Sequence, residues 1–322
     1  MCKFSIIVPC YNIEKNVNFL FNMLSVREYS DYEVIFIDDC SRDQTFDVLC
    51  KTQPSRSEYR CFRCFQTQQN GGPGVARNVG LEFAEGEYIL FCDSDDGFNI
   101  DILPKLDTFL SQHQDSDMIV FPHRVLKNGK TAKVDKYKSY DDSATISPQD
   151  IVLGNLAPWA KLYKAQIIRE NQLKFPTRWT GEDACFVINY VIHLQKIYKM
   201  DYYYYDYIVN RSSITHKKGI DFNQQTTFEI LQPIYRKHFP DIEVKMFAKM
   251  HLLTKAKQMC AVSLPTKEIR YWFRNENKRY PNWINQMDLQ NQSLYNKMIY
   301  WAMYNNHALI IKMIMKLREF IY

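Results

Sequence analysis

Three acidic residues in a short turn, Asp93, Asp95 and Asp96, directly follow the apolar residues 88–92. Like charges this close raise one another's pKa unless a positive group offsets them. Two acids spaced two apart at the end of a strand can both bind one hard divalent cation, which prefers oxygen ligands. Acids are also common at helix N-termini, but the helix expected at residues 102–112 needs one such acid, not three. The pattern therefore favours a divalent metal site, and Asp96 could serve as a ligand or as the helix cap.

Two further expected strands also end in polar residues. Residues 4–8 form a strand that Pro9 stops before Cys10-Tyr11-Asn12, and residues 32–37 lead to Asp38-Asp39. The expected strands at 4–8, 32–37, 88–92 and 118–122 alternate with expected helices at 16–26, 44–51, 74–84 and 102–112. Such alternation predicts a parallel α/β sheet with helices on both faces, in which ligands bind beyond the carboxyl ends of the strands. The sequence therefore predicts one acidic pocket at one edge of the sheet.

The glycine-rich segment Asn70-Gly71-Gly72-Pro73-Gly74 lacks the Lys-Ser/Thr pair of a phosphate-binding P-loop. Its glycines would instead allow the backbone to pass close to a ligand. The absence of a GxGxxG pattern argues against a dinucleotide-binding fold of the usual kind. Asp39, at the end of the second strand, could accept hydrogen bonds from a base or a ribose.

The C-terminal part of the chain has a different character. Asn128-Gly129 at the centre of residues 124–134 predicts a β-hairpin. Beyond residue 220 the strand signal fades, and residues 222–239, 244–262 and 294–320 predict helices. We therefore expect two domains, residues 1–220 and 221–322.

Charge is distributed unevenly along the 322 residues, whose net charge is +5. Residues 245–322 hold 13 Lys/Arg against 4 Asp/Glu, whereas the preceding 244 residues hold 28 against 32. The basic region either contacts an anionic surface, membrane or nucleic acid, or is a solvated helical face. The nine cysteines have no framework spacing and the chain enters a strand without a secretory signal, which fits a reducing cytosol. No apolar run reaches the ~20 residues that a membrane-spanning helix needs.

Four blocks of the sequence, residues 4–12, 36–45, 70–80 and 93–96, together resemble the glycosyltransferase family 2 pattern of bacterial cell-surface polysaccharide enzymes. A fifth block, residues 181–186, is similar to the acidic motif that carries the base of that family. Residues 158–163, with Trp159, resemble a segment common in bacterial members. The resemblance implies a GT-A fold, a Rossmann-like and mostly parallel sheet with helices on both faces, followed here by a helical C-terminal region.

The resemblance also implies a site for a UDP-sugar donor. Pro9 and Tyr11 would flank the uracil, and Asp39 would bond its polar edge. The remaining donor contacts would be Asn70, Gly71, Arg77, Asp93, Ser94, Arg211 and Ser212. Asp95 would bind Mg²⁺ or Mn²⁺ across the two phosphates, with Asp93 and His216 as further metal ligands.

On the acceptor side the resemblance makes Asp183 the general base. The pattern from Thr180 to Asp183 is also typical of a helix N-terminus with Thr180 as its cap. Asp183 can be both the base and part of that helix start. Glu182 would bind the acceptor or orient the base. Trp159 is either a platform for the acceptor or part of the core.

The resemblance implies an inverting, metal-dependent glycosyltransferase. The sequence holds no Gln-x-x-Arg-Trp motif and no spanning helix, so we expect it to be non-processive. It would move a hexose or N-acetylhexosamine from a UDP-sugar to a glycan acceptor carried on lipid. A nucleotidyltransferase and a non-catalytic binding protein are the alternatives. The expected location is the cytoplasm, with peripheral contact of the C-terminal helices on the inner membrane as a further hypothesis and no nucleic-acid partner.

Overall fold

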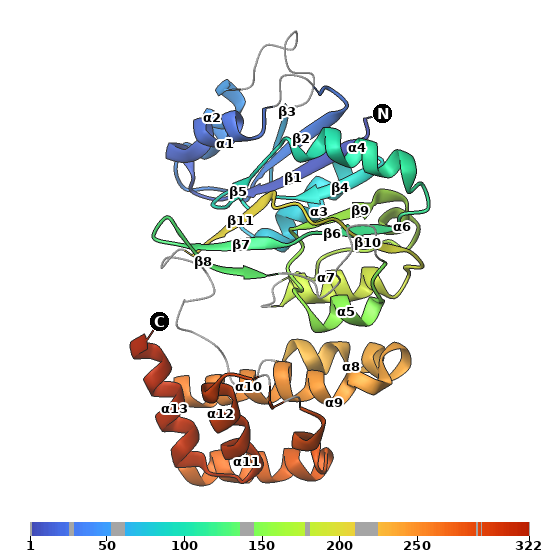
Figure 1. Cartoon of the computed structure of the whole chain (residues 1–322). Coiled ribbons are helices and arrows are strands. Elements are labelled where there is room, and N and C mark those ends of the chain that lie inside the picture. The colour runs from blue at the N-terminus through green and yellow to red at the C-terminus, as the bar shows by residue number, and fades with distance from the viewer. Residues whose placement is uncertain are drawn as a thin grey trace. The chain divides into compact units, whose positions relative to one another are not determined.

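The computed structural model describes residues 2–25, 29–52, 62–135, 145–177, 181–209, 225–287, 289–290 and 292–321. The chain divides into two compact units, Met1–Arg211 and Ser212–Tyr322 (Figure 1). The boundary predicted near residue 220 falls outside the described residues.

The first unit is built on a seven-stranded sheet in the order β10-β6-β9-β4-β1-β2-β3. The strands are β1 (Phe4–Cys10), β2 (Tyr32–Asp38), β3 (Phe62–Gln66), β4 (Tyr88–Phe91), β6 (Met118–Val120), β9 (Lys161–Lys164) and β10 (Ile197–Lys199). β1 pairs in parallel with both β2 and β4, whereas β9 runs antiparallel to β4 and β6. The predicted mostly parallel α/β sheet is thus confirmed, with one reversed strand that was not predicted.

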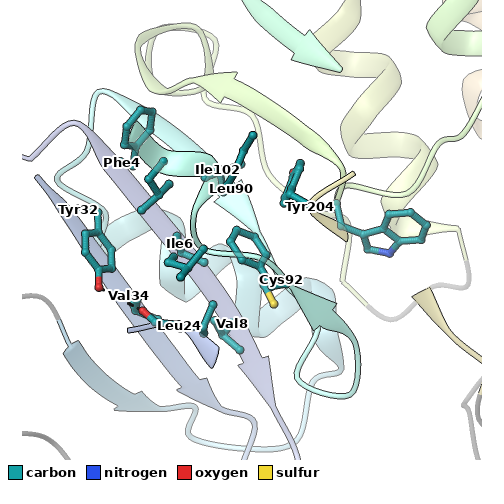
Figure 2. Close-up of a cluster of buried hydrophobic side chains, with 14 of the residues drawn as sticks. Phe4, Ile6, Val8, Leu24, Tyr32, Val34, Leu90, Cys92, Ile102 and Tyr204 are labelled. Carbon is teal, nitrogen blue, oxygen red and sulfur yellow. Dashed lines mark hydrogen bonds between the residues drawn. The ribbon is translucent and has the colours of Figure 1, made fainter. Parts of the chain in front are cut away.

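Helices cover both faces of this sheet (Figure 1). They are α1 (Val17–Met23), α2 (Thr45–Thr52), α3 (Pro73–Phe83), α4 (Ile102–Gln112), α5 (Pro148–Leu153), α6 (Ala165–Glu170) and α7 (Glu182–Val191). All seven residues of β1 are buried, as expected for a strand that is covered on both sides. Ile6 and Val8 join a core cluster with Ile102 of α4 (Figure 2). On the other face Gly80 of α3 lies so close to β1 that a Cβ there would be 2.4 Å from the Ile7 side chain.

Pro9 does not end the first strand, as the sequence suggested. β1 continues to Cys10, and Pro9 is in register with Ile37 of β2. A proline next to the end of a strand removes only one backbone donor, so the pairing continues past it.

The first unit also holds a smaller four-stranded sheet in the order β5-β11-β7-β8. Its strands are β5 (Gly97–Phe98), β7 (His123–Lys127), β8 (Lys130–Asp135) and β11 (Tyr205–Ile208). Asn128 and Gly129 join β7 to β8 with φ values of 52° and 73°. Two positive φ angles are typical of a type I′ turn, so the predicted hairpin is confirmed.

The second unit is helical throughout its described residues. Its helices are α8 (Thr227–His238), η3 (Pro240–Ile242), α9 (Glu243–Met246), the π-helix η4 (Phe247–Leu252), α10 (Leu253–Ala261), α11 (Thr266–Arg279), η5 (Trp283–Gln286), α12 (Leu294–Tyr304) and α13 (Ala308–Ile321). The predicted helix 294–320 is two helices, because Asn306 adopts a left-handed φ of 58° between them. Within the described ranges, no helix combines the length and the apolar character that crossing a bilayer requires.

Candidate active site

The three polar strand ends lie at one edge of the large sheet. β1 separates β2 from β4 and is parallel to both, so neighbouring strand ends hold Cys10, the last residue of β1, and Asp39 and Asp93 just beyond β2 and β4. The backbone N–H of Asp39 donates to the carbonyl oxygen of Cys10 at 2.8 Å. The predicted convergence of these segments is therefore found in the structure.

Arg77 places a buried positive charge at this edge. Its guanidinium donates to Oδ1 of Asp93 at 2.6 Å and to Oδ1 of Asp183 at 2.7 Å. The Arg77 side chain is only 2 % exposed, and its Nε has no hydrogen-bond partner among the described residues. Arg77 thus joins the turn after β4 to the start of α7. The family resemblance assigned the first segment to the donor and the metal, and the second to the acceptor.

Helix α3 positions Arg77 and also holds the segment before α7. Pro73 occupies the first turn of α3, and Gly72 precedes it with a φ of 85° that favours glycine. Asn78 exchanges two hydrogen bonds of 2.8 Å with the backbone of Phe175. The Phe175 ring lies 5.3 Å from the Arg77 guanidinium carbon. One helix therefore fixes both the cation and the chain that leads to Asp183.

Asp183 lies in the first turn of α7, and its side chain is 35 % exposed. Burial raises the pKa of Asp183 to about 6, with the charge of Arg77 opposing the rise and that of Glu182 adding to it. A carboxyl group with this pKa is largely ionised at neutral pH and can accept a proton. Glu182 is half-buried beside it.

The expected cap of α7 needs correction. Gly181, with a φ of 101°, occupies the N-cap position, whereas Thr180 lies outside the described residues. The Asp183 carboxylate, in the first turn of α7, bonds Arg77.

Asp39 holds the glycine-rich loop in place. Its carboxylate accepts the N–H of Gly71 at 3.0 Å, the N–H of Gly72 at 2.7 Å and the hydroxyl of Thr67 at 3.0 Å. The Asn70 side chain donates to the Asp39 carbonyl oxygen at 3.1 Å. Asp39 is 3 % exposed, so the residue predicted to bond a nucleobase has a structural task as well.

The three aspartates of the acidic turn lie in different environments. Asp93 is half-buried against Arg77, Asp95 is exposed and Asp96 is 1 % exposed. The Asp96 carboxylate accepts the Tyr205 hydroxyl at 2.6 Å and the Ile208 N–H at 2.8 Å. Burial and the charge of Asp93 raise the pKa of Asp96 to about 8.

Asp96 is not a helix cap, because α4 begins at Ile102 and Asp101 occupies its N-cap position. The cap interpretation of Asp96 was therefore wrong. Its carboxyl group instead connects the acidic turn to β11.

Asp93 and Asp95 fit a hard divalent cation by their chemistry. Both offer carboxylate oxygens from one turn, and such ions commonly take phosphate oxygens or water as their other ligands. Among the described residues, no three His, Cys, Asp or Glu side chains form a metal-binding group. His216, Arg211 and Ser212 lie outside the described residues. The two carboxylates would supply part of the ligand set of such an ion, and phosphate oxygens of a nucleotide fit its other positions.

The other predicted residues have varied environments. Pro9 is buried in the sheet, Tyr11 is 36 % exposed and Ser94 is half-buried. Trp159 is 7 % exposed, and its ring stacks on those of Tyr205 and Tyr207 with centroids 4.7 Å and 5.6 Å away. A sugar platform requires an open ring face, so the core alternative describes Trp159 and the platform alternative does not.

Two residues of the site were not predicted. The Tyr205 hydroxyl accepts the Asp93 N–H at 3.2 Å in addition to its bond to Asp96. Lys161 is fully buried and donates to the Ala157 carbonyl oxygen at 2.7 Å. Burial lowers the pKa of Lys161 to about 7, and the charge of Asp183 opposes that change. Lys161 lies within residues 158–163, the segment that resembles bacterial family members, and that resemblance was the signal that could have identified it.

Comparisons with known proteins agree with this arrangement. TarS of Staphylococcus aureus (strain Mu50), a poly(ribitol-phosphate) beta-N-acetylglucosaminyltransferase, is 30 % identical over 238 residues, which cover 73 % of this chain and 40 % of TarS. A poly(ribitol-phosphate) beta-glucosyltransferase of Bacillus spizizenii is 34 % identical over 215 residues, covering 65 % of this chain and 32 % of that protein. The chain thus spans less than half the length of these two relatives.

Solved structures show the same fold. The crystal structure of S. aureus TarS 1-349 in complex with UDP-GlcNAc superposes with a TM-score of 0.71 at 23 % identity, covering 98 % of this chain and 91 % of that one. The expected GT-A fold with a helical C-terminal region is confirmed. Residues 5–181 match the model of glycosyl transferase family 2, a span of more than half the sequence. The chain therefore belongs to glycosyl transferase family 2.

Proposed function

We propose that this chain is an inverting, metal-dependent and non-processive glycosyltransferase of cell-surface polysaccharide biosynthesis. It moves a hexose or N-acetylhexosamine from a UDP-sugar to a hydroxyl group of a glycan acceptor. The observation that carries the proposal is the bridge by which Arg77 joins Asp93 to Asp183 at the carboxyl edge of the sheet. The Arg77 guanidinium thus holds Asp93, a candidate contact of the sugar donor, close to Asp183, the candidate base.

The relatives support a choice of sugar and acceptor. TarS and the Bacillus relative are named for N-acetylglucosamine and glucose transfer to poly(ribitol-phosphate), and a TarS structure holds UDP-GlcNAc. We therefore propose UDP-N-acetylglucosamine or UDP-glucose as the donor and a polyol-phosphate chain as the acceptor. If that chain is lipid-linked, transfer takes place at the cytoplasmic face of a membrane.

Asp183 performs the proton transfer in this proposal. Its ionised carboxylate takes the proton of the acceptor hydroxyl while that oxygen attacks the anomeric carbon, and the bond from that carbon to the UDP oxygen breaks. Attack from the face opposite the leaving group inverts the anomeric configuration. Arg77 favours the ionised form of Asp183 and orients its carboxylate.

Asp93 and Asp95 serve the leaving group. When bound, Mg²⁺ or Mn²⁺ offsets the charge that develops on the departing diphosphate. The two carboxylates would hold that ion, and Arg77 reduces the repulsion between them and Asp183. Tyr205 keeps the turn in place by bonding both the Asp93 backbone and Asp96.

The test is UDP release with and without acceptor. We expect Asp183→Asn to lower turnover by about 10²–10⁴-fold while UDP binding is retained, because the amide cannot accept the proton. Asp241→Asn, at an exposed position of the second unit, is the matched control and should leave turnover unchanged. Both variants are assayed with UDP-N-acetylglucosamine, UDP-glucose and Mn²⁺.

Release of pyrophosphate in place of UDP would identify a nucleotidyltransferase instead. Full turnover by Asp183→Asn would remove the base assignment. Turnover that survives complete chelation of divalent ions would remove the metal from the proposal.

A further inference from the structure

The solvent-facing side of helix α12 carries large apolar side chains. Leu294 is 74 % exposed, Met298 48 % and Trp301 49 %. Their spacing of four and three residues places them in one line along the helix. The buried residues of α12 lie on its other side: Ile299, Tyr300, Ala302 and Met303. The exposed line is therefore separate from the face by which α12 packs within its unit.

Helix α13 repeats this arrangement. Leu309 is 62 % and Met313 64 % exposed, four residues apart, whereas Ile311 and Ile314 between and beyond them are buried. Helix α13 packs against α12. The Trp301 ring stacks on His307 in the turn between the helices, with centroids 4.9 Å apart. We call Leu294, Met298, Trp301, Leu309 and Met313 the apolar stripes.

Positive charge accompanies both stripes. Lys297 directly precedes Met298 and Lys312 directly precedes Met313, so a lysine flanks each stripe on the same side of its helix. Lys316 continues the line of α13 by one turn and is exposed. Residues 289–317 contain no Asp or Glu. Lysine stems can lie along apolar surface while their ammonium groups reach polar surroundings.

We infer that the apolar stripes dock on the surface of an anionic lipid bilayer. Amphipathic helices with Trp, Leu and Met on one side and lysines beside them lie in the plane of the membrane interface. Apolar side chains enter the boundary of the acyl region, tryptophan favours the headgroup level, and the lysines attract anionic lipids. This partner is additional to donor and acceptor, and its recognition involves no residue of the candidate active site.

A second copy of the chain fits this surface less well. A symmetric dimer through the stripes would bring the same patch of both copies together and gather Lys297, Lys312 and Lys316 of both copies in one interface. The stretch contains no carboxylate that could pair with them. Like charges opposed across an interface weaken it, whereas anionic headgroups neutralise them.

Vesicle sedimentation of the full chain tests the inference. Vesicles of equal parts phosphatidylglycerol and phosphatidylcholine are compared with vesicles of phosphatidylcholine alone, at low salt and at about 0.5 M salt. We expect binding to the anionic vesicles that salt weakens. The triple change Leu294→Ser, Met298→Ser and Trp301→Ser should lower it at least about tenfold.

The matched control changes Phe19→Ser and Phe83→Ser, which are 63 % and 39 % exposed on helices of the first unit. It removes apolar surface elsewhere and should leave vesicle binding unchanged. Lys297→Gln with Lys312→Gln and Lys316→Gln is a second variant that keeps the apolar stripes and should abolish the preference for anionic vesicles. Far-ultraviolet circular dichroism and UDP release on a soluble acceptor report whether each variant is folded.

No binding to anionic vesicles by the wild-type chain would overturn the inference. So would binding that both variants retain. If light scattering instead showed a dimer that the triple serine variant dissociates, the stripes would be a contact between copies of the chain.

Discussion

At the scale of single residues, Arg77 is the counter-charge that the acidic turn requires. A buried charge is costly unless it is paired, and Arg77 is paired twice. The planar guanidinium offers several donors in fixed directions, so it can bond Asp93 and Asp183 at once. A lysine ammonium is a compact point charge and cannot span both carboxylates in this geometry.

We predict that Arg77→Gln moves the acid limb of the activity profile to higher pH. Burial raises the pKa of Asp183 to about 6, and the charge of Arg77 opposes that rise. Removing the Arg77 charge therefore lets the pKa of Asp183 rise further. More alkaline solution is then needed to ionise the base, and the value of kcat/KM for acceptor reports this. The Asp93 carboxylate also loses a partner, so donor binding should weaken in the same variant.

Arg63→Gln is the matched control, because Arg63 also bonds two carboxylates, those of Glu33 and Glu85, each at 3.0 Å. It lies away from the site and should leave the acid limb unchanged. An acid limb that does not move in Arg77→Gln would show that Arg77 has no influence on the base.

At the scale of elements, the loop from Asn70 to Gly72 depends on Asp39. Three donors converge on that carboxylate, two of them backbone N–H groups. Backbone donors that are shielded from water need a partner, and Gly71 and Gly72 belong to no strand that would supply one. Asp39 therefore connects the end of β2 to the start of α3, the helix that carries Arg77.

We predict that Asp39→Asn lowers the free energy of unfolding by about 1–3 kcal/mol even without nucleotide. The amide can accept through one atom only, so one N–H of Gly71 or Gly72 faces another donor. Urea unfolding measures the loss. Asp47→Asn, exposed on α2, should change stability by less than about 0.5 kcal/mol. If Asp39→Asn left the free energy of unfolding unchanged but weakened UDP binding, Asp39 would have a role in nucleobase binding and none in stabilising the loop.

The elements themselves were largely predictable, for local reasons. The spacing of apolar residues predicted α4 at residues 102–112 with the bounds observed, and Asn128-Gly129 predicted the hairpin. β9 was not predicted, because Lys161 and Lys164 at its ends do not suggest a buried strand. β3 was missed for a related reason, since three of its five residues are only partly buried.

The site was predictable as a set of residues but not as a set of contacts. The family resemblance named Arg77, Asp93 and Asp183, yet it assigned Arg77 to the donor alone. The bond between Arg77 and Asp183 joins positions 106 apart in sequence, which no periodic pattern reports. The partners of Asp96, Tyr205 and Ile208, are 109 and 112 positions away, so its helix-cap interpretation rested only on neighbours in sequence.

At the scale of the whole molecule, the chain has two compact units with different contents. The candidate nucleotide contacts among the described residues all lie in Met1–Arg211. The second unit carries the basic helices and the apolar stripes. Ligands of the two units should therefore act on different unfolding transitions.

We predict that UDP with Mn²⁺ raises the thermal transition of the first unit and leaves that of the second unchanged. A ligand at about 100 times its dissociation constant stabilises the unit that binds it by about 2.7 kcal/mol. Differential scanning calorimetry of the full chain resolves the transitions, and ADP serves as the control nucleotide. Equal shifts of all transitions would indicate that the units unfold together.

The long-range bond of Arg77 also constrains how this protein can be shortened. The segment that matches the family model ends at residue 181, two positions before Asp183. A truncation at that boundary would keep helix α3 and its buried guanidinium but remove one of its two carboxylates. The loss would leave an under-neutralised charge within the folded core, a cost that sequence matching alone does not reveal. A minimal catalytic fragment must therefore extend through α7 for the sake of its stability as well as its chemistry.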